Sequence, residues 1–164
     1  MPTPILTEPQ IQQKLRRIAY EIYERHHEAA ELILAGINNN GYRVAARLHA
    51  ILEEISPIQS KLTRIRLNPA APAEHPVTLE MPTEEMHGKP IIIVDDVANT
   101  GRTLAYACRP FFDIIPEAIQ VAVLVERKHK RYPIVADFVG LSLATTWSDN
   151  VVVDLEKMVV RFGE

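Results

Sequence analysis

Runs of consecutive apolar residues alternate along the chain with segments in which apolar residues recur every three or four positions. The runs at 32–37, 91–94 and 119–125 are rich in β-branched residues, which is typical of strands buried on both faces of a parallel sheet. Helical spacing covers residues 7–26, 42–55 and 102–112. This alternation predicts an α/β fold with a parallel central sheet and helices on both of its faces.

Two weaker patterns predict additions to this sheet. Residues 60–67 and 77–81 alternate between apolar and polar, and the loop between them contains three prolines, which predicts two short arms joined by an irregular loop. Residues 150–154 and 158–162 predict a β-hairpin that covers one edge of the sheet, with 155–157 as its turn.

The most informative stretch spans residues 90–104 and reads PIIIVDDVANTGRTL. Asp95 and Asp96 follow a buried strand, and a small polar loop then leads into a helix. Backbone N–H groups at such a helix start bind anions, Gly101 permits close approach, and the hydroxyls of Thr100 and Thr103 can donate hydrogen bonds. Carboxylates suit sugar hydroxyls or a divalent cation. The stretch therefore predicts a site for a phosphorylated sugar, whereas the alternative is an ordinary loop and helix cap.

A second polar loop, Asn38-Asn39-Asn40-Gly41, follows the apolar run at 32–37 and precedes a helix. It allows two interpretations: a second anion loop, or a turn chosen only because asparagine and glycine tolerate positive φ.

Composition narrows the class of protein. The 164 residues are 47% hydrophobic and 24% charged, which predicts one globular domain over 1–164. The net charge of −3 argues against general nucleic-acid binding, although the basic run 126–131 could be a solvated loop, a phosphate contact or a nucleic-acid contact. A single cysteine, Cys108, excludes an internal disulfide. No apolar run is long enough to span a membrane, so a cytoplasmic protein with no membrane partner is expected.

The stretch 90–104 closely resembles the phosphoribosyl-pyrophosphate (PRPP) signature of the type I phosphoribosyltransferases, and the whole chain most resembles their PyrR-like branch of pyrimidine operon regulators and uracil phosphoribosyltransferases. The resemblance implies the type I phosphoribosyltransferase fold, in which the two arms form a small hood. It implies transfer of ribose 5-phosphate from PRPP to a nucleobase, uracil favoured, with Mg²⁺ and release of pyrophosphate. It further implies a homodimer or a higher homo-oligomer.

The same resemblance implies roles for individual residues. The catalytic residues would be Asp95, Asp96 and Asn99, with Asp95 and Asp96 holding the ribose hydroxyls and the metal. The 5′-phosphate would bind to Asn99, Thr100, Gly101, Arg102 and Thr103. Pyrophosphate would bind to Ile37, Asn38, Asn39, Asn40 and Gly41. The base would stack on Phe138, be read by the backbone of Val139 and receive a hydrogen bond from Thr145; the alternative for Phe138 is a place in the core.

Three departures from the family pattern favour a second hypothesis. Relatives carry Lys-Thr-Arg in place of the three asparagines, a Tyr-Arg-Asp-Asp-like stretch in place of residues 67–70, and Asp or Tyr in place of Asn99. Charge-assisted contacts are about twice as strong as neutral ones, so these changes weaken the case for efficient catalysis. The alternative is a catalytically weak regulator that senses PRPP or a nucleotide. RNA binding through residues 127–131, Arg43 and Arg47 would accompany it, but the acidic composition disfavours it.

Overall fold

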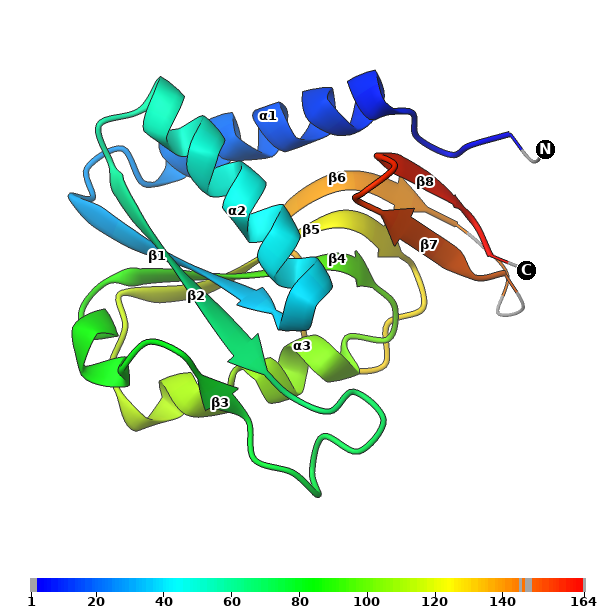
Figure 1. Ribbon diagram of the computed structural model, residues 1–164. Coiled ribbons are helices and arrows are strands. Elements are labelled where there is room, and N and C mark those ends of the chain that lie inside the picture. The colour runs from blue at the N-terminus through cyan, green and yellow to red at the C-terminus, as the bar shows by residue number, and fades with distance from the viewer. Residues whose placement is uncertain (1–2, 145, 147–148, 164) are drawn as a thin grey trace.

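The structure is a computed structural model that describes residues 3–144, 146 and 149–163. Its centre is a six-stranded sheet with the order β3-β2-β1-β4-β5-β6 (Figure 1). All neighbours pair in parallel except β2 and β3, as the sequence predicts for the core strands. The strands are β1 (Glu31–Ile37), β2 (Gln59–Arg66), β3 (Thr78–Leu79), β4 (Pro90–Ala98), β5 (Ala118–Arg127) and β6 (Phe138–Leu143).

The order of the strands creates a reversal at the centre of the sheet. The chain passes from β1 outward to β2 and β3, then returns to β4 on the other side of β1 and continues outward to β5 and β6. In open α/β sheets, ligands bind at the carboxyl ends of the strands beside such a reversal. The topology therefore points to the carboxyl ends of β1 and β4.

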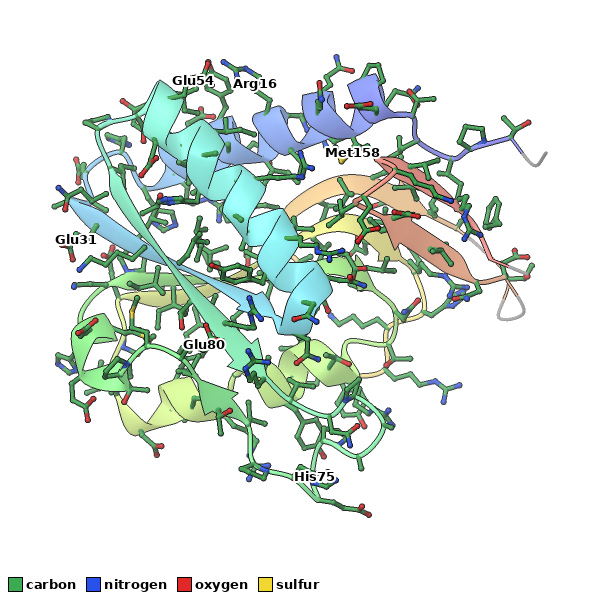
Figure 2. The ribbon with its side chains drawn as sticks, viewed as in Figure 1. Arg16, Glu31, Glu54, His75, Glu80 and Met158 are labelled. Atoms are coloured by element: carbon green, nitrogen blue, oxygen red, sulfur yellow. The ribbon has the colours of Figure 1, made fainter. Side chains whose placement is uncertain are left out.

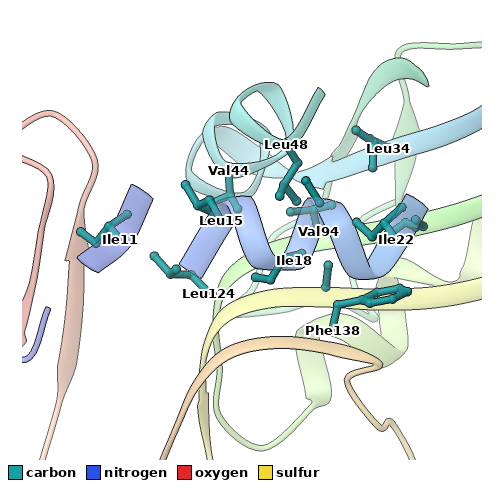
Figure 3. Close-up of a cluster of buried hydrophobic side chains, with 14 of the residues drawn as sticks. Ile11, Leu15, Ile18, Ile22, Leu34, Val44, Leu48, Val94, Leu124 and Phe138 are labelled. Carbon is teal, nitrogen blue, oxygen red and sulfur yellow. The ribbon is translucent and has the colours of Figure 1, made fainter. Parts of the chain in front are cut away.

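Helices cover both faces of the sheet. On one face lie α1 (Glu8–Arg25) and α2 (Asn38–Ile55), and on the other lie α3 (Arg102–Ala107) and two 3₁₀ helices, η1 (Thr83–Met86) and η2 (Arg109–Asp113). Each layer buries its own apolar cluster against the sheet. In the larger cluster, the inward faces of α1 and α2 pack on side chains from β1, β4, β5 and β6 (Figure 3).

Local sequence explains how two of these helices begin and end. Thr7 and Gln10 form the expected capping box at the start of α1, where the Thr7 N–H donates to Gln10 Oε1 at 2.9 Å. The helix predicted over 102–112 is shorter than expected, because α3 ends at Ala107 and the chain continues as η2. Pro110 is the physical reason: it has no N–H to donate, and its ring clashes with the preceding turn of an α-helix.

Two appendages complete the structure. Strands β7 (Val151–Asp154) and β8 (Val159–Phe162) form the predicted hairpin, and Leu6 near the other end of the chain bridges to Val160 in β8. The predicted arms are also present, since Ile65 of β2 pairs antiparallel with Leu79 of β3. Between them runs the hood loop, residues 67–77, whose His75 projects away from the sheet (Figure 2). Within the described part of the chain, no helix is long and apolar enough to cross a membrane.

Candidate functional site

The two adjacent carboxylates lie within β4 and not after it, because the strand runs four residues farther than its apolar run predicts. Pairing with β1 stops at Val94, whereas pairing with β5 continues through Asp95 and on to Ala98. The end of β4 therefore projects beyond β1 and carries both carboxylates to the carboxyl edge of the sheet. The side chain of Asp95 is buried, with 9% of the residue exposed.

The first turn of α2 fills the space that β1 leaves beside the end of β4. This approach depends on Gly41, because a Cβ there would lie 2.5 Å from the carbonyl oxygen of Val94. Gly36 allows a similarly close contact, since its Cβ would lie 2.4 Å from Cα of Tyr42. The two glycines thus bring the start of a helix, with its unpaired N–H groups, against the acidic pair.

The described residues donate only one hydrogen bond to each of the two carboxylates. One oxygen of Asp95 accepts the N–H of Asp96 at 2.9 Å, and one oxygen of Asp96 accepts the N–H of Val97 at 2.8 Å. The other oxygen of each accepts no hydrogen bond from the described residues. Burial raises the pKa of Asp95 well above its ordinary value, and the neighbouring charge of Asp96 raises it further. A bound cation or a hydroxyl donor would stabilise the charged form of this buried carboxylate.

A cavity of about 430 Å³ joins the acidic pair to the asparagine loop. Its walls combine residues 37–40, Asp95, Asp96 and Thr103 with Pro69 of the hood loop. The structure thus brings together two of the clusters that the sequence singled out, with the hood loop against them. Among the described residues, no group of three or more histidine, cysteine or acidic side chains could hold a metal ion.

The asparagine loop is not the free turn that the sequence predicts. Helix α2 starts at Asn38, which has a φ of 51°. The Asn38 side chain donates to the Leu67 carbonyl at 3.0 Å and accepts the Leu67 N–H at 3.1 Å. Asn39 accepts a 3.1 Å hydrogen bond from Arg64, whose guanidinium stacks 4.2 Å from the ring centroid of Tyr42. Two of the three amides therefore fasten the arms of the hood.

The loop that follows β4, residues 99–103, is called the anion loop below, after the role that the sequence predicts for it. Gly101 adopts the left-handed conformation, with a φ of 87°, that turns the chain into α3. The carbonyl of Thr100 accepts the N–H groups of Arg131, at 2.8 Å, and Tyr132, at 3.1 Å, which fix the loop from outside. A hollow of about 50 Å³ lies between this loop and Asp95.

Arg102 connects the anion loop to the hood loop. Its Nη2 donates to the carbonyl of Pro69 at 2.7 Å, so the guanidinium is engaged with the hood and not with the loop that it belongs to. The exposed position of Arg102 leaves the side chain able to exchange this carbonyl for an anion.

The predictions for the base site require correction. Phe138 is 1% exposed, and its ring packs under α1 near Ile18 and Ile22, with the Arg25 guanidinium 5.2 Å from its centroid (Figure 3). The ring is a core side chain, so the predicted stacking on a base is wrong. The carbonyl of Val139 accepts a 2.7 Å hydrogen bond from Arg17, and the predicted role of its backbone stays a prediction. Thr145, the third predicted base contact, lies outside the described residues.

The basic run contains a residue, Arg127, whose contact with Asn99 the sequence did not predict. Arg127 and His129 are buried, whereas Lys128, Lys130 and Arg131 are exposed, so the run is not a uniformly solvated face. Arg127 Nη1 donates to Asn99 Oδ1 at 3.0 Å and thereby contacts the anion loop. The sequence feature that could have indicated this contact is the position of Arg127 at the end of β5, a strand that ends beside the anion loop. Of the other proposed RNA contacts, Arg43 forms an ion pair of 3.5 Å with Glu156.

Comparisons with known proteins agree with this geometry. The sequence profile of the family described as "Phosphoribosyl transferase domain" matches residues 3–157. The chain is 36% identical to "Bifunctional protein PyrR" of Herpetosiphon aurantiacus, covering 96% of this chain and 92% of that protein. It is 38% identical to the protein of the same name from Streptomyces coelicolor, covering 93% and 82%. Its fold is similar to the hypoxanthine phosphoribosyltransferase of Trypanosoma cruzi, with a TM-score of 0.78, 18% identity and coverage of 98% and 95%.

Proposed function

Because the chain belongs to the phosphoribosyltransferase family, we propose that it transfers the ribose 5-phosphate group of PRPP to a nucleobase, with uracil the favoured acceptor, and releases pyrophosphate. One observation carries the proposal: two hollows meet at the reversal point of the sheet. The start of α2 and the acidic pair line the larger hollow, the anion loop lines the smaller one, and Asp95 and Thr103 belong to both. PRPP has a pyrophosphate, ribose hydroxyls and a 5′-phosphate, and the three elements suit these groups in turn.

In this proposal, the chain works mainly by binding and orientation. The bond between C1′ of the ribose and pyrophosphate breaks, and pyrophosphate leaves with the electron pair. A base nitrogen forms the new bond to C1′, and its proton passes to the released pyrophosphate or to water. Asp95 and Asp96 hold the ribose hydroxyls, and residues 99–103 hold the 5′-phosphate. Fixing both ends of the donor presents C1′ to the base in one orientation. Asn99 cannot take the proton, because an amide is not a base.

Mg²⁺ fits the donor set of the site. Mg²⁺ commonly binds through one or two carboxylates together with substrate phosphates and water, and Asp95 and Asp96 each offer one oxygen without a hydrogen bond from the described residues. When bound, the ion would neutralise charge on the leaving pyrophosphate. This matters here because the larger cavity has two acidic side chains and no basic side chain in its walls.

That same imbalance supports a second candidate, a regulator of the PyrR type that binds PRPP or a nucleotide but has little catalysis. Asn38 and Asn39 are engaged with the hood, so pyrophosphate would be held chiefly by backbone N–H groups at the start of α2. Neutral donors hold an anion less strongly than cationic side chains do. The enzyme remains the favoured candidate, because every element that PRPP needs lies in one place.

The deciding experiment measures pyrophosphate release from PRPP with Mg²⁺ in the presence of uracil, hypoxanthine, guanine or xanthine. Turnover with uracil is expected, and the double variant Asp95→Asn/Asp96→Asn should lose it, whereas the exposed Asp113→Asn control should keep it. Absence of turnover with every base, together with PRPP binding that the double variant abolishes, would replace the enzyme by the regulator. PRPP that fails to bind the wild-type protein would overturn both.

A further inference from the structure

Arg127 joins two parts of the chain that are far apart in the sequence. It is the last residue of β5 and only 7% exposed. Its Nη1 donates to Asn99 Oδ1 at 3.0 Å, in the anion loop. Its Nη2 donates to the carbonyls of Thr146, at 2.9 Å, and Asp149, both beyond the end of β6. One guanidinium thus spans the anion loop and the segment that leads from β6 to β7.

On the far side of this bridge, Thr146 and Asp149 contact each other. The N–H of Asp149 donates to the carbonyl of Thr146 at 3.2 Å, and the N–H of Thr146 donates to the Asp149 carboxylate at 3.2 Å. These two residues, called the β6–β7 turn below, therefore form a unit that the guanidinium holds by two carbonyls. The near side is the Asn99 amide, which follows directly after β4.

The burial of Arg127 makes this bridge stiff. Hydrogen bonds from an ionised donor are shorter and stronger than those between neutral groups, and an unmade hydrogen bond of a buried cation carries its full desolvation penalty. If Asn99 moves, the guanidinium must follow or lose a partner, and the same holds if the turn moves. The positions of the anion loop and the β6–β7 turn are therefore not independent.

We propose that Arg127 is a positioning residue that couples occupation of the anion loop to the conformation of the β6–β7 turn. The inference rests on the proposed function, because it takes the anion loop as the binding site of a sugar 5′-phosphate. An anion in the loop fixes Asn99, Asn99 fixes the guanidinium, and the guanidinium fixes the turn. Since coupling between two sites is reciprocal, a ligand that fixes the turn raises the affinity of the loop for phosphate by the same factor.

The sequence supplies a reporter for this coupling. Trp147 is the only tryptophan of the chain and stands between Thr146 and Asp149 in the sequence. Its emission therefore reports on the segment to which the turn belongs. Ribose 5-phosphate is the suitable probe, because it has the sugar phosphate but no base that could stack on an aromatic ring directly.

The experiment titrates ribose 5-phosphate into the wild-type protein and into Arg127→Gln, and follows binding by calorimetry and the emission of Trp147. The wild-type protein should bind and change its emission with the same midpoint. Arg127→Gln should bind about tenfold more weakly, within the range usual for coupled sites, and should show no emission change at saturation. The exposed Arg109→Gln is the matched control and should behave as the wild-type protein does.

A second variant keeps the test decisive if Arg127→Gln does not fold. Asn99→Ala cuts the bridge on its other side. Because residue 99 belongs to the anion loop, this variant should bind the probe more weakly, and it should show no emission response even at saturating probe. The double variant Asn99→Ala/Arg127→Lys should show the same loss of emission response as Asn99→Ala alone, because the effects of mutations within one hydrogen-bonded network do not add. An emission response that survives in either bridge variant would overturn the coupling and leave the proposed function intact. Failure of ribose 5-phosphate to bind the wild-type protein would overturn the phosphate site itself and the coupling with it.

Discussion

The side-chain amide of Asn38 forms two hydrogen bonds with the backbone of Leu67, to its carbonyl at 3.0 Å and from its N–H at 3.1 Å. One residue at the start of α2 thus holds the first residue of the hood loop by two hydrogen bonds. Asn38 does so in a left-handed conformation, which asparagine adopts more readily than most residues. The residue that the sequence offered as a pyrophosphate ligand is therefore first of all a structural link between α2 and the hood.

This link predicts the effects of two substitutions at position 38. Asn38→Gly keeps the backbone conformation and loses both hydrogen bonds, so it should lower the free energy of unfolding by about 1–2 kcal/mol. Asn38→Ala adds the strain of a Cβ at positive φ and should cost about 1 kcal/mol more. Urea unfolding measures both. Asn40→Ala, on the exposed side of the same turn, should change stability by less than about 0.5 kcal/mol. Equal stability of the Gly and Ala variants would contradict the left-handed assignment.

The raised pKa of Asp95 predicts a conflict between stability and binding. A carboxyl whose pKa is higher in the folded protein than in the unfolded chain makes stability fall as pH rises from about 4 toward the folded value. Asp95→Asn removes the buried charge, so it should be more stable than the wild-type protein at pH 7. It should also lose PRPP binding.

Thermal unfolding between pH 4 and pH 8 tests this expectation. The difference in melting temperature between Asp95→Asn and the wild-type protein should grow as the pH rises, whereas Asp113→Asn should follow the wild-type curve. Mg²⁺ with PRPP should narrow the difference by stabilising only the protein that binds them. A constant difference across the pH range would mean that Asp95 does not titrate there.

The close approach of α2 to β4 predicts that Gly41 is irreplaceable. Its Cβ would lie 2.5 Å from the Val94 carbonyl, so Gly41→Ala must displace the start of the helix or the end of the strand. We expect a loss of about 1–3 kcal/mol in stability, as in other overpacked sites, and weaker PRPP binding. Gly88→Ala provides the comparison, because nothing lies within 4 Å of its Cβ and only its φ of 75° is strained. Gly88→Ala should lower the free energy of unfolding by about 1 kcal/mol and leave PRPP binding unchanged.

The buried position of Phe138 predicts that it governs stability and not the choice of base. Phe138→Leu should lower the free energy of unfolding by about 1 kcal/mol or more, because the ring fills the core under α1. The relative rates of turnover with the four bases should not change. If they do change, the ring contacts the base after all, and α1 must move to admit it.

The sequence predicted the parallel core strands β1, β4 and β5 because the evidence for them is local, whereas it did not predict β6 or the order of the strands. Unbroken apolar runs mark buried strands wherever they occur, and alternation with helices dictates parallel pairing. The extension of β4 through Asp95 to Ala98 was not predictable in the same way. Carboxylates do not favour strands, and it is the pairing with β5, a tertiary contact, that holds them in one.

The site was predicted less completely than the fold, for reasons of distance and orientation. The residues at 95–103 were identified because they are contiguous in the sequence. The partner of Asn38 is 29 residues away, and that of Asn99 is 28 residues away, so neither contact leaves a local pattern. Phe138 was misassigned because its role came from the resemblance, which does not say on which face of β6 the ring lies, and here α1 covers that face.

The bridge between Leu6 and Val160 has a consequence for how the protein is made. These residues are 154 positions apart, so the backbone bridge of Leu6 cannot form until β8 has emerged from the ribosome. The sheet from β1 to β6 can pair before then, because none of its strand pairings needs β8. Leu6 is therefore synthesised before the whole sheet but gains its strand contact after it.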